Sequence, residues 1–186
     1  MTGVQTCALP ILALALRALR KSAARSLEIH ICEELSALNM PKVRFVCEFT
    51  EAPLGPDGLD SLRFLMSANV GEALKPLSRV ASGGELARIM LAMKNVMAEH
   101  ETVSTLIFDE VDAGVSGRAA QKVAEKLRSV AQGRQVLCVT HLPQLAALAE
   151  HHLLISKSER QGRTYTEVTV LDRPGRIDEQ IGRAHV

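Results

Sequence analysis

The sequence lacks the features that mark several common classes of protein. Its 186 residues contain no apolar run close to the roughly 20 residues that span a bilayer, so we expect no membrane-spanning segment. Lys and Arg number 22 against 21 Asp and Glu, and this balance excludes a general attraction to polyanions such as nucleic acid. A charged fraction of 23% with almost no net charge also excludes a disordered acidic or basic tail.

Cysteine is scarce and forms no recognisable motif. The four residues, Cys7, Cys32, Cys47 and Cys138, include no C-x-x-C pair and lie mostly in apolar runs. This pattern predicts reduced core thiols of a cytosolic protein, and it argues against a disulfide framework and a zinc site. The chain does have apolar content: 47% hydrophobic residues over this length are enough for one domain with a buried core, although only 3% are aromatic.

The two ends of the chain are related at the level of DNA. Residues 6–11 (TCALPI) can be encoded by ACGTGTGCTCTTCCGATC, and the complementary strand, read one base further on, encodes residues 181–186 (IGRAHV). Chance similarity is the alternative, but a shared segment of this kind is typical of a sequencing adapter. We therefore expect residues 1–11 and 181–186 to be translated adapter, with the natural gene continuing beyond both, and we leave Cys7 and His185 out of the functional argument.

A long amphipathic helix is predicted over residues 12–40, because apolar side chains recur there in steps of three and four. Pro41 is expected to end it. The apolar stripe either faces an ordinary core or is the stub of a coiled coil; its members are Leu16, Leu19, Ala23, Leu27, Ile31, Leu35 and Leu38. Four basic residues on the early turns, which we interpret as a solvated face and not as a DNA contact, are Arg17, Arg20, Lys21 and Arg25.

The segments that follow predict an antiparallel pair of strands. Residues 43–49 alternate between apolar and polar side chains, and residues 62–68 supply a second strand. Proline and glycine at 53–58 predict the turn between them. Residues 74–80, which include a proline, are expected to form a loop.

A second helix opens at the segment Ser82-Gly83-Gly84-Glu85 and should end near His100. Ser82 and Glu85 have the spacing of a capping box, in which each side chain satisfies a backbone amide. The glycines let amides approach a ligand closely and the helix N-terminus favours an anion, so this is a candidate phosphate site; a simple cap is the alternative. The apolar face, interpreted as core packing, contains Leu86, Ile89, Met90, Met93 and Met97.

Strands and helices alternate in the second half of the chain. The two strands there are continuous apolar runs, typical of parallel strands buried on both faces, and the order of elements indicates an α/β sheet with parallel members. Ser116 is expected to cap the first helix. The predicted elements are strands at 103–108 and 135–140, helices at 116–133 and 143–150, and a hairpin of 153–156 with 164–171.

Acidic and imidazole side chains come directly after the two predicted parallel strands. Asp109 and Glu110 follow the first strand and His141 follows the second, where open α/β sheets bind ligands. An Asp at this place can orient Mg²⁺, a Glu can polarise an attacking water, and a His can hydrogen-bond a terminal phosphate oxygen. A solvated turn and a structural histidine are the alternatives. The histidines that we interpret as structural are His30, His100, His151 and His152.

Taken in this order, the three segments resemble the C-terminal half of an ABC-type ATPase head. Segment 82–85 matches the signature motif, with Ala81 and Glu85 where transporter members have Leu and Gln. The amino-acid sequence around these motifs resembles one family in particular, the RecN family of SMC-like ATPases. The segments that carry this resemblance are VASGGELARIMLAMK, TLIFDEVDAGVSGRAAQKVAEKL and QVLCVTHLPQLAALA. The resemblance covers most of residues 12–180, with its specific motifs between residues 76 and 153.

The resemblance implies a role for each candidate residue. Asp109 stands where the Walker B aspartate holds Mg²⁺, usually through water. Glu110 stands at the position of the catalytic glutamate and His141 at that of the switch histidine. Residues 111–117 occupy the D-loop position, which adds Asp112 to the ATP-binding set. The remaining members of that set, contributed to the ATP of a partner head, are Ser82, Gly83, Gly84 and Glu85.

The implied fold is α/β: residues 41–180 form the C-terminal lobe of an ABC/SMC-type P-loop ATPase head, and helix 12–40 is a coiled-coil arm. No G-x-x-x-x-G-K-[ST] motif occurs, so the Walker A loop would belong to a missing N-terminal half, and this chain alone should not hydrolyse ATP. The resemblance further implies a homodimer with ATP and Mg²⁺ between two heads. It implies recombinational repair of double-strand breaks, with DNA bound by the full-length protein in the cytoplasm, on the nucleoid.

Two other functions stay open on the sequence. One is the head of another SMC-like or ABC-type ATPase; a long coiled coil upstream would exclude a transporter, and a hinge domain would indicate chromosome condensation. The other is a non-catalytic module that uses the capped helix to bind an anionic partner. Nucleotide binding, tested after co-expression with the N-terminal half, would separate this module from an ATPase.

Overall fold

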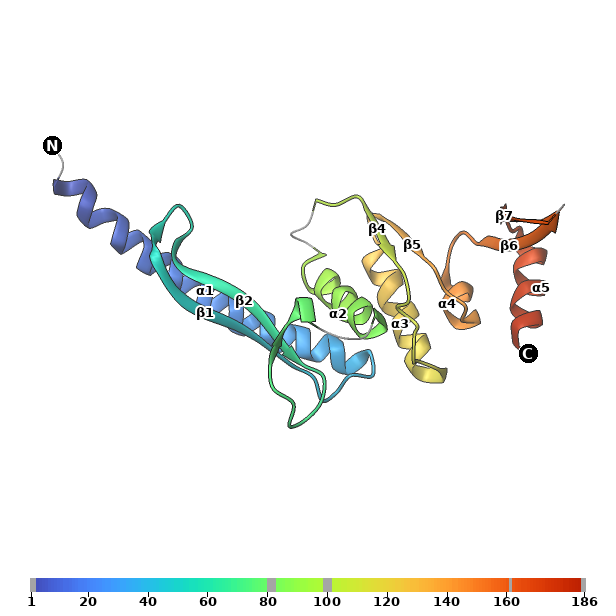
Figure 1. Ribbon diagram of the computed structural model, residues 1–186, viewed down its shortest axis with the longest axis horizontal. Coiled ribbons are helices and arrows are strands. Elements are labelled where there is room, and N and C mark those ends of the chain that lie inside the picture. Colours follow the sequence, from blue (N-terminus) through green and yellow to red (C-terminus); the bar gives the residue numbers. More distant parts are fainter. Residues whose placement is uncertain (1–2, 80–82, 99–101, 161, 185–186) are drawn as a thin grey trace. The chain divides into compact units, whose positions relative to one another are not determined.

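The computed structural model describes residues 3–79, 83–98, 102–160 and 162–184 (Figure 1). The chain divides into two compact units, Met1–Thr102 and Val103–Val186. Among the described residues, unit 1 has one sheet and unit 2 has two, and each unit has its own buried side chains. The boundary between the two units lies after the helix that begins at Gly83 and before the strand that begins at Thr105.

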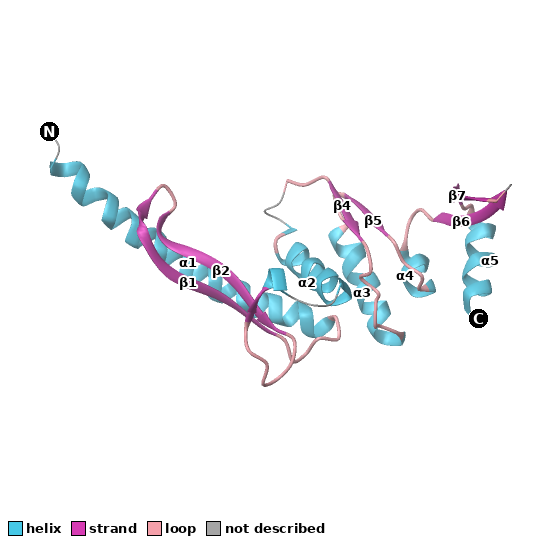
Figure 2. Ribbon diagram, viewed as in Figure 1, coloured by secondary structure: helices cyan, strands magenta, loops and turns pink. Residues whose placement is uncertain are grey.

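Unit 1 combines a long helix with an antiparallel sheet of three strands in the order β1-β2-β3. Figure 2 shows the hairpin formed by β1 and β2 in magenta. The hairpin of β1 and β2 lies along α1, and α2 also packs on α1. The predicted junction between adapter and native sequence, at residues 11 and 12, falls inside α1. The elements are α1 (Gly3–Ala37), β1 (Arg44–Gly55), β2 (Gly58–Ser67), β3 (Lys75–Pro76), the 3₁₀ turn η1 (Leu77–Arg79) and α2 (Gly83–Val96).

The end of α1 differs from the prediction that Pro41 terminates the helix. α1 ends at Ala37, and Asn39 then adopts a left-handed backbone with φ of 64°. The Met40 amide donates to the Leu35 carbonyl at 2.9 Å, as in a Schellman cap. Asn tolerates this conformation better than most residues, because its short polar side chain can hydrogen-bond locally. The cap therefore stops the helix before the proline can act.

The buried stripe of α1 also differs from the predicted one in its first half. Leu19 is 70% exposed and Ala23 is exposed, whereas Ala24 is buried. At about 100° per residue, Leu19 lies ~120° around the helix from Ile31, while Ala24 lies within ~20° of it. Apolar spacing in steps of three and four therefore predicted the wrong buried side for the early turns of α1. The predicted members that are fully buried are Ile31, Leu35 and Leu38.

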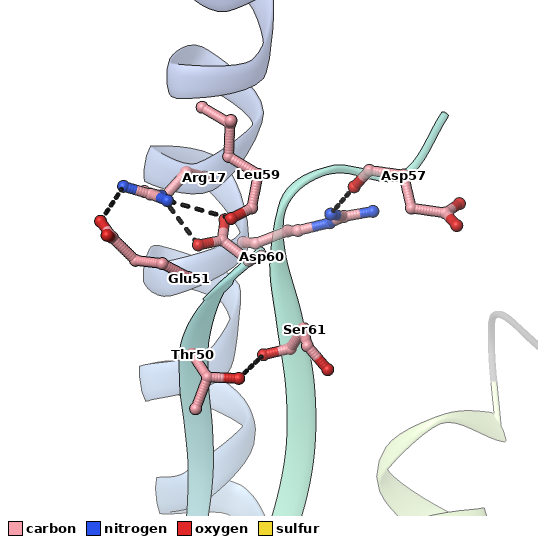
Figure 3. Close-up of polar contacts among 8 residues, drawn as sticks. Arg17, Thr50, Glu51, Asp57, Leu59, Asp60 and Ser61 are labelled. Atoms are coloured by element: carbon pink, nitrogen blue, oxygen red, sulfur yellow. Dashed lines mark hydrogen bonds and ion pairs between the residues drawn. The ribbon is translucent and has the colours of Figure 1, made fainter. Parts of the chain in front are cut away.

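Two of the four basic residues on α1 hold the hairpin, which corrects their interpretation as a solvated face (Figure 3). The Arg17 guanidinium lies 2.8 Å from Asp60 Oδ1 and 3.3 Å from Glu51 Oε1, and it donates to the Leu59 carbonyl at 3.1 Å. Arg20 donates to the carbonyl of Asp57, in the hairpin turn. The Asp60 side chain is only 5% exposed, so this ion pair is largely shielded from water.

The hairpin is longer than predicted. β1 continues to Gly55, so the turn narrows from 53–58 to Pro56 and Asp57, and Gly58 takes up the left-handed backbone with φ of 97°. An irregularity in the pairing between Glu51 and Gly55 accommodates the extra residues of β1. The predicted loop at 74–80 contains β3 and η1 over residues 75–79.

The face that α2 buries is not the one predicted. Ile89 is fully buried as expected, but Leu86 and Met90 are 37% and 38% exposed. The Asn95 side chain donates to Glu34 Oε2 at 2.7 Å and thereby fixes α2 to α1. The other buried residues, spaced at steps of one, three and four, are Gly84, Arg88, Leu91 and Ala92.

Unit 2 contains a parallel strand pair, an antiparallel hairpin and three helices among the residues described. The alternation of strands and helices is as predicted, apart from α5, for which no element was predicted. Ser116 occupies the N-cap position of α3 with an extended backbone, although its side chain makes no capping hydrogen bond. The elements are β4 (Thr105–Phe108), α3 (Gly117–Val130), β5 (Gln135–Cys138), α4 (Pro143–Leu148), β6 (Leu153–Arg160), β7 (Arg163–Val170) and α5 (Arg173–Ala184).

The parallel pair β4–β5 is buried on one face, not on both as predicted. Leu106 and Phe108 are buried, whereas Ile107 is 70%, Leu137 42% and Val139 51% exposed. Ile107 and Leu137 are opposite each other in the pair, and alternate residues of a strand share a face, so all three lie on the same side. Parallel sheets are normally covered on both faces by crossover helices. Over the described residues, this apolar face has no such cover.

None of the helices, within the ranges that the structure describes, is both long enough and apolar enough to cross a membrane.

Candidate functional site

The acidic pair lies in the turn that follows β4. Asp109 and Glu110 are both exposed, and the Ala113 amide donates to the Glu110 carbonyl at 3.0 Å. Glu110 has a left-handed backbone with φ of 57°. For a residue with a side chain this conformation costs about 1–2 kcal/mol, and such strain is concentrated at functional sites. The turn therefore presents two carboxylates to solvent from a constrained backbone.

β5 brings the histidine to the same edge of the sheet. β4 and β5 run parallel with Phe108 opposite Cys138, and the Val139 amide extends the ladder by donating to the Phe108 carbonyl at 2.9 Å. His141 follows, with 72% of its side chain exposed. The acidic turn at 109–110 and the histidine thus leave the sheet at its carboxyl end, where open α/β sheets bind ligands.

Asp112 connects the two segments. Its side chain is 3% exposed, and its Oδ2 accepts hydrogen bonds from the Thr140 hydroxyl at 2.5 Å and from the His141 amide at 3.2 Å. The Nδ1 atom of His141 lies 3.4 Å from the same oxygen. Thr140 Oγ1 in turn accepts from the Leu142 amide at 3.0 Å. One buried carboxylate oxygen therefore ties the loop after β5 to the turn after β4.

Thr140 is the residue of this site that the sequence did not reveal. The available signal was a hydroxyl side chain between an apolar strand and a histidine, which is too common to single out. Asp112 was predicted as an ATP-binding residue, and that stays a prediction. Its contacts in the structure are instead with Thr140 and His141.

The signature segment belongs to unit 1. Ser82 lies outside the described residues, so its implied contribution to the ATP of a partner head stays a prediction. Gly83 and Gly84 begin α2, and Glu85 is half-buried in its first turn. Burial lowers the pKa of Arg88, one turn further along, while the charge of Glu85 acts in the opposite direction.

The acidic edge fits a metal ion that arrives with its ligand. Among the residues described, no group of three or more His, Cys, Asp or Glu side chains could hold a metal by itself. Asp109 nevertheless offers an exposed carboxylate at the strand end. Mg²⁺ commonly keeps several waters and is held by one or two carboxylates together with substrate phosphates. Asp109 therefore suits a magnesium ion bound to a nucleotide.

Cys138, the last residue of β5, has a thiol that stays protonated at neutral pH. Burial, reinforced by the negative charges of Asp112 and Asp109, raises the pKa of its thiol to about 12. A half-buried thiol with a raised pKa is consistent with the reduced cysteine that the sequence predicts.

Iodoacetamide should alkylate Cys138 about 30-fold more slowly at pH 8 than it alkylates an unstructured cysteine peptide. The raised pKa keeps the thiol protonated, and this loss outweighs the greater intrinsic reactivity of a more basic thiolate. Timed alkylation followed by mass spectrometry measures the rate, which should keep rising with pH well above pH 9. The urea-unfolded chain is the control and should react like the peptide; an equal rate in the folded chain would contradict the prediction.

Comparison with known proteins identifies the family. No family model matches the chain. The DNA repair protein RecN of Halalkalibacterium halodurans is 49% identical over 170 residues, which cover 89% of this chain. The chain belongs to the RecN family. It spans about 30% of the length of that RecN relative.

Solved structures agree with the RecN assignment at the level of fold. The SMC head domain with coiled coil and joint from Pyrococcus yayanosii matches 89% of this chain and 30% of that chain, with a TM-score of 0.60 and 22% identity. A second SMC ATPase structure, from work on ATP-driven dimerisation and DNA-stimulated activation, matches 89% of this chain and 96% of that chain, with a TM-score of 0.51 and 20% identity. The predicted α/β fold of an SMC-type head is therefore confirmed.

Proposed function

We propose that the complete protein is an SMC-like ATPase that binds ATP and Mg²⁺ between two heads and acts in recombinational repair of DNA double-strand breaks. The observation that carries this proposal is the common sheet edge from which Asp109, Glu110 and His141 emerge. Support for the biological role comes from relatives named as DNA repair proteins. DNA would be bound by the full-length protein.

The chemistry of each residue suits one task in phosphoryl transfer to water. Asp109 would hold Mg²⁺ through a water molecule, and Glu110 would accept a proton from the attacking water. His141, whose imidazole is largely exposed, would hydrogen-bond the terminal phosphate. ATP, when bound, supplies the phosphoryl group, and its transfer depends mainly on positioning and on neutralisation of charge. Three side chains at one edge meet those requirements.

The pocket would be completed by two further parts of the assembled protein. The N-terminus of α2, with Ser82, Gly83 and Gly84, would serve the ATP held by a partner head, because free amides there attract phosphate. A half of the head that carries the Walker A loop would cover the apolar face of β4–β5. The exposure of Ile107 and Leu137 supports this part of the proposal.

We further propose that α1 is a coiled-coil arm. On one side of α1, Leu12 and Leu19 lie ~20° apart around the helix and are 64% and 70% exposed. A second helix packed on this side would bury them. The predicted adapter origin of residues 1–11 and 181–186 stays part of this proposal, since the arm would then continue into natural sequence.

The experiment that tests the function places the segment in a full-length RecN relative. A chimera in which residues 12–180 replace the matching segment of Halalkalibacterium halodurans RecN should hydrolyse ATP within tenfold of that RecN. The 186-residue chain alone should show no turnover above background, because it has no Walker A motif. A chimera with Asp109→Asn is the control for contaminating ATPase. Robust hydrolysis by the isolated chain, or none by the chimera, would contradict the proposal.

A further inference from the structure

Among the residues that the structure describes, no lysine or arginine side chain pairs with the buried carboxylate of Asp112. Its side chain is 3% exposed, and its Oδ2 faces a hydroxyl, a backbone amide and the His141 ring. Removing a carboxylate from water is costly unless hydrogen bonds replace the lost hydration. The Thr140 hydroxyl and the His141 amide, which donate to Oδ2, must therefore stay in place for Asp112 to remain buried, and the loop that carries them is constrained accordingly.

We propose that Asp112 is a positioning residue, which fixes the backbone and the imidazole of His141 relative to the acidic turn. The amide bond to Oδ2 holds the main chain of His141. The same oxygen lies 3.4 Å from Nδ1, so the opposite ring nitrogen, Nε2, is left to face a ligand. The identity of that ligand as the terminal phosphate rests on the proposed function.

Asp112 also connects His141 to the segment that a partner head would contact. The Val115 amide donates to the Asp112 carbonyl at 3.2 Å, and the Ala113 amide donates to the Glu110 carbonyl at 3.0 Å. Residues 110–115 therefore form consecutive hydrogen-bonded turns. A displacement of these turns during head closure would move the Asp112 carboxylate and, through it, His141. This gives one buried side chain the task of aligning Glu110 with His141.

Two measurements test the inference separately from the proposed function. The first is amide hydrogen exchange of the 186-residue chain, in which Asp112→Ala and the near-isosteric Thr140→Val should each speed exchange at His141 and Leu142 at least tenfold. Thr140→Ser, which keeps the hydroxyl, should restore protection. Asp60→Asn is the matched control, because Asp60 is a similarly buried carboxylate in unit 1.

The second measurement is ATP turnover by the chimera. Asp112→Ala and Thr140→Val should lower kcat at least tenfold, leave the KM for ATP within about threefold and add nothing to a His141→Ala background. A raised KM with unchanged kcat would overturn the inference, since Asp112 would then contact the nucleotide. Additivity with His141→Ala, or unchanged exchange at His141, would overturn it as well.

The two proposals fail in different ways. A chimera without ATPase activity overturns the proposed function and the catalytic purpose of Asp112. Exchange at His141 in the isolated chain then still decides whether Asp112 holds the loop.

Discussion

Glu110→Gln in the chimera should lower ATP turnover by about 10²–10⁴-fold, the range associated with loss of a general base. An amide cannot accept a proton at neutral pH, whereas its size and its backbone demands match those of glutamate. The substitution therefore leaves the left-handed turn at φ of 57° as it is. ATP should still bind, so closed dimers should accumulate, and size-exclusion chromatography with light scattering would detect them.

The control for Glu110→Gln is Glu125→Gln, on the exposed surface of α3. Glu125 pairs with its helix neighbours, at 3.0 Å from Lys122 and 3.1 Å from Gln121, and surface pairs of this kind contribute little. Its turnover and dimerisation should match those of the unmodified chimera. A Glu110→Gln chimera that keeps more than a tenth of the turnover, or that stays monomeric with ATP, would remove Glu110 from the catalytic role.

Leu35→Ala should destabilise unit 1 by about 2–5 kcal/mol, the usual range for a fully buried leucine. Leu35 is 0% exposed, and its carbonyl accepts the hydrogen bond that caps α1. Truncation leaves a cavity between α1 and the elements packed on it. Urea unfolding of the 186-residue chain, followed by far-UV circular dichroism, gives the change in the free energy of unfolding.

Leu19→Ala on the same helix is the matched control. Both leucines belong to the stripe predicted from the sequence, but Leu19 is 70% exposed. Its truncation should change the free energy of unfolding by less than about 0.5 kcal/mol, because surface substitutions rarely do more and alanine is a strong helix former. Equal losses for Leu19 and Leu35 would contradict the burial of α1 described above.

The sequence determined the order and type of most elements, and it named the candidate residues of the site except Thr140. Period and composition are properties of neighbouring residues along the chain, so they indicate the type of an element before its packing partners are known. The stripe of α3 illustrates this: Ala120, Val123, Leu127 and Val130 are all buried, as the helical period predicts. The motifs around Asp109, Glu110 and His141 could likewise be recognised from the sequence, because each directly follows an apolar strand.

The tertiary structure alone decided which sides of α1 and α2 are buried and which residues meet. The side of α1 that faces inward is set by the hairpin, whose Asp60 receives Arg17, a basic residue that its local pattern assigns to solvent. Asp112 and Thr140 are 28 positions apart, and they meet only because β4 and β5 pair in parallel. Local periodicity carries no information about such a pairing, since its energy arises from contacts between segments and not within them.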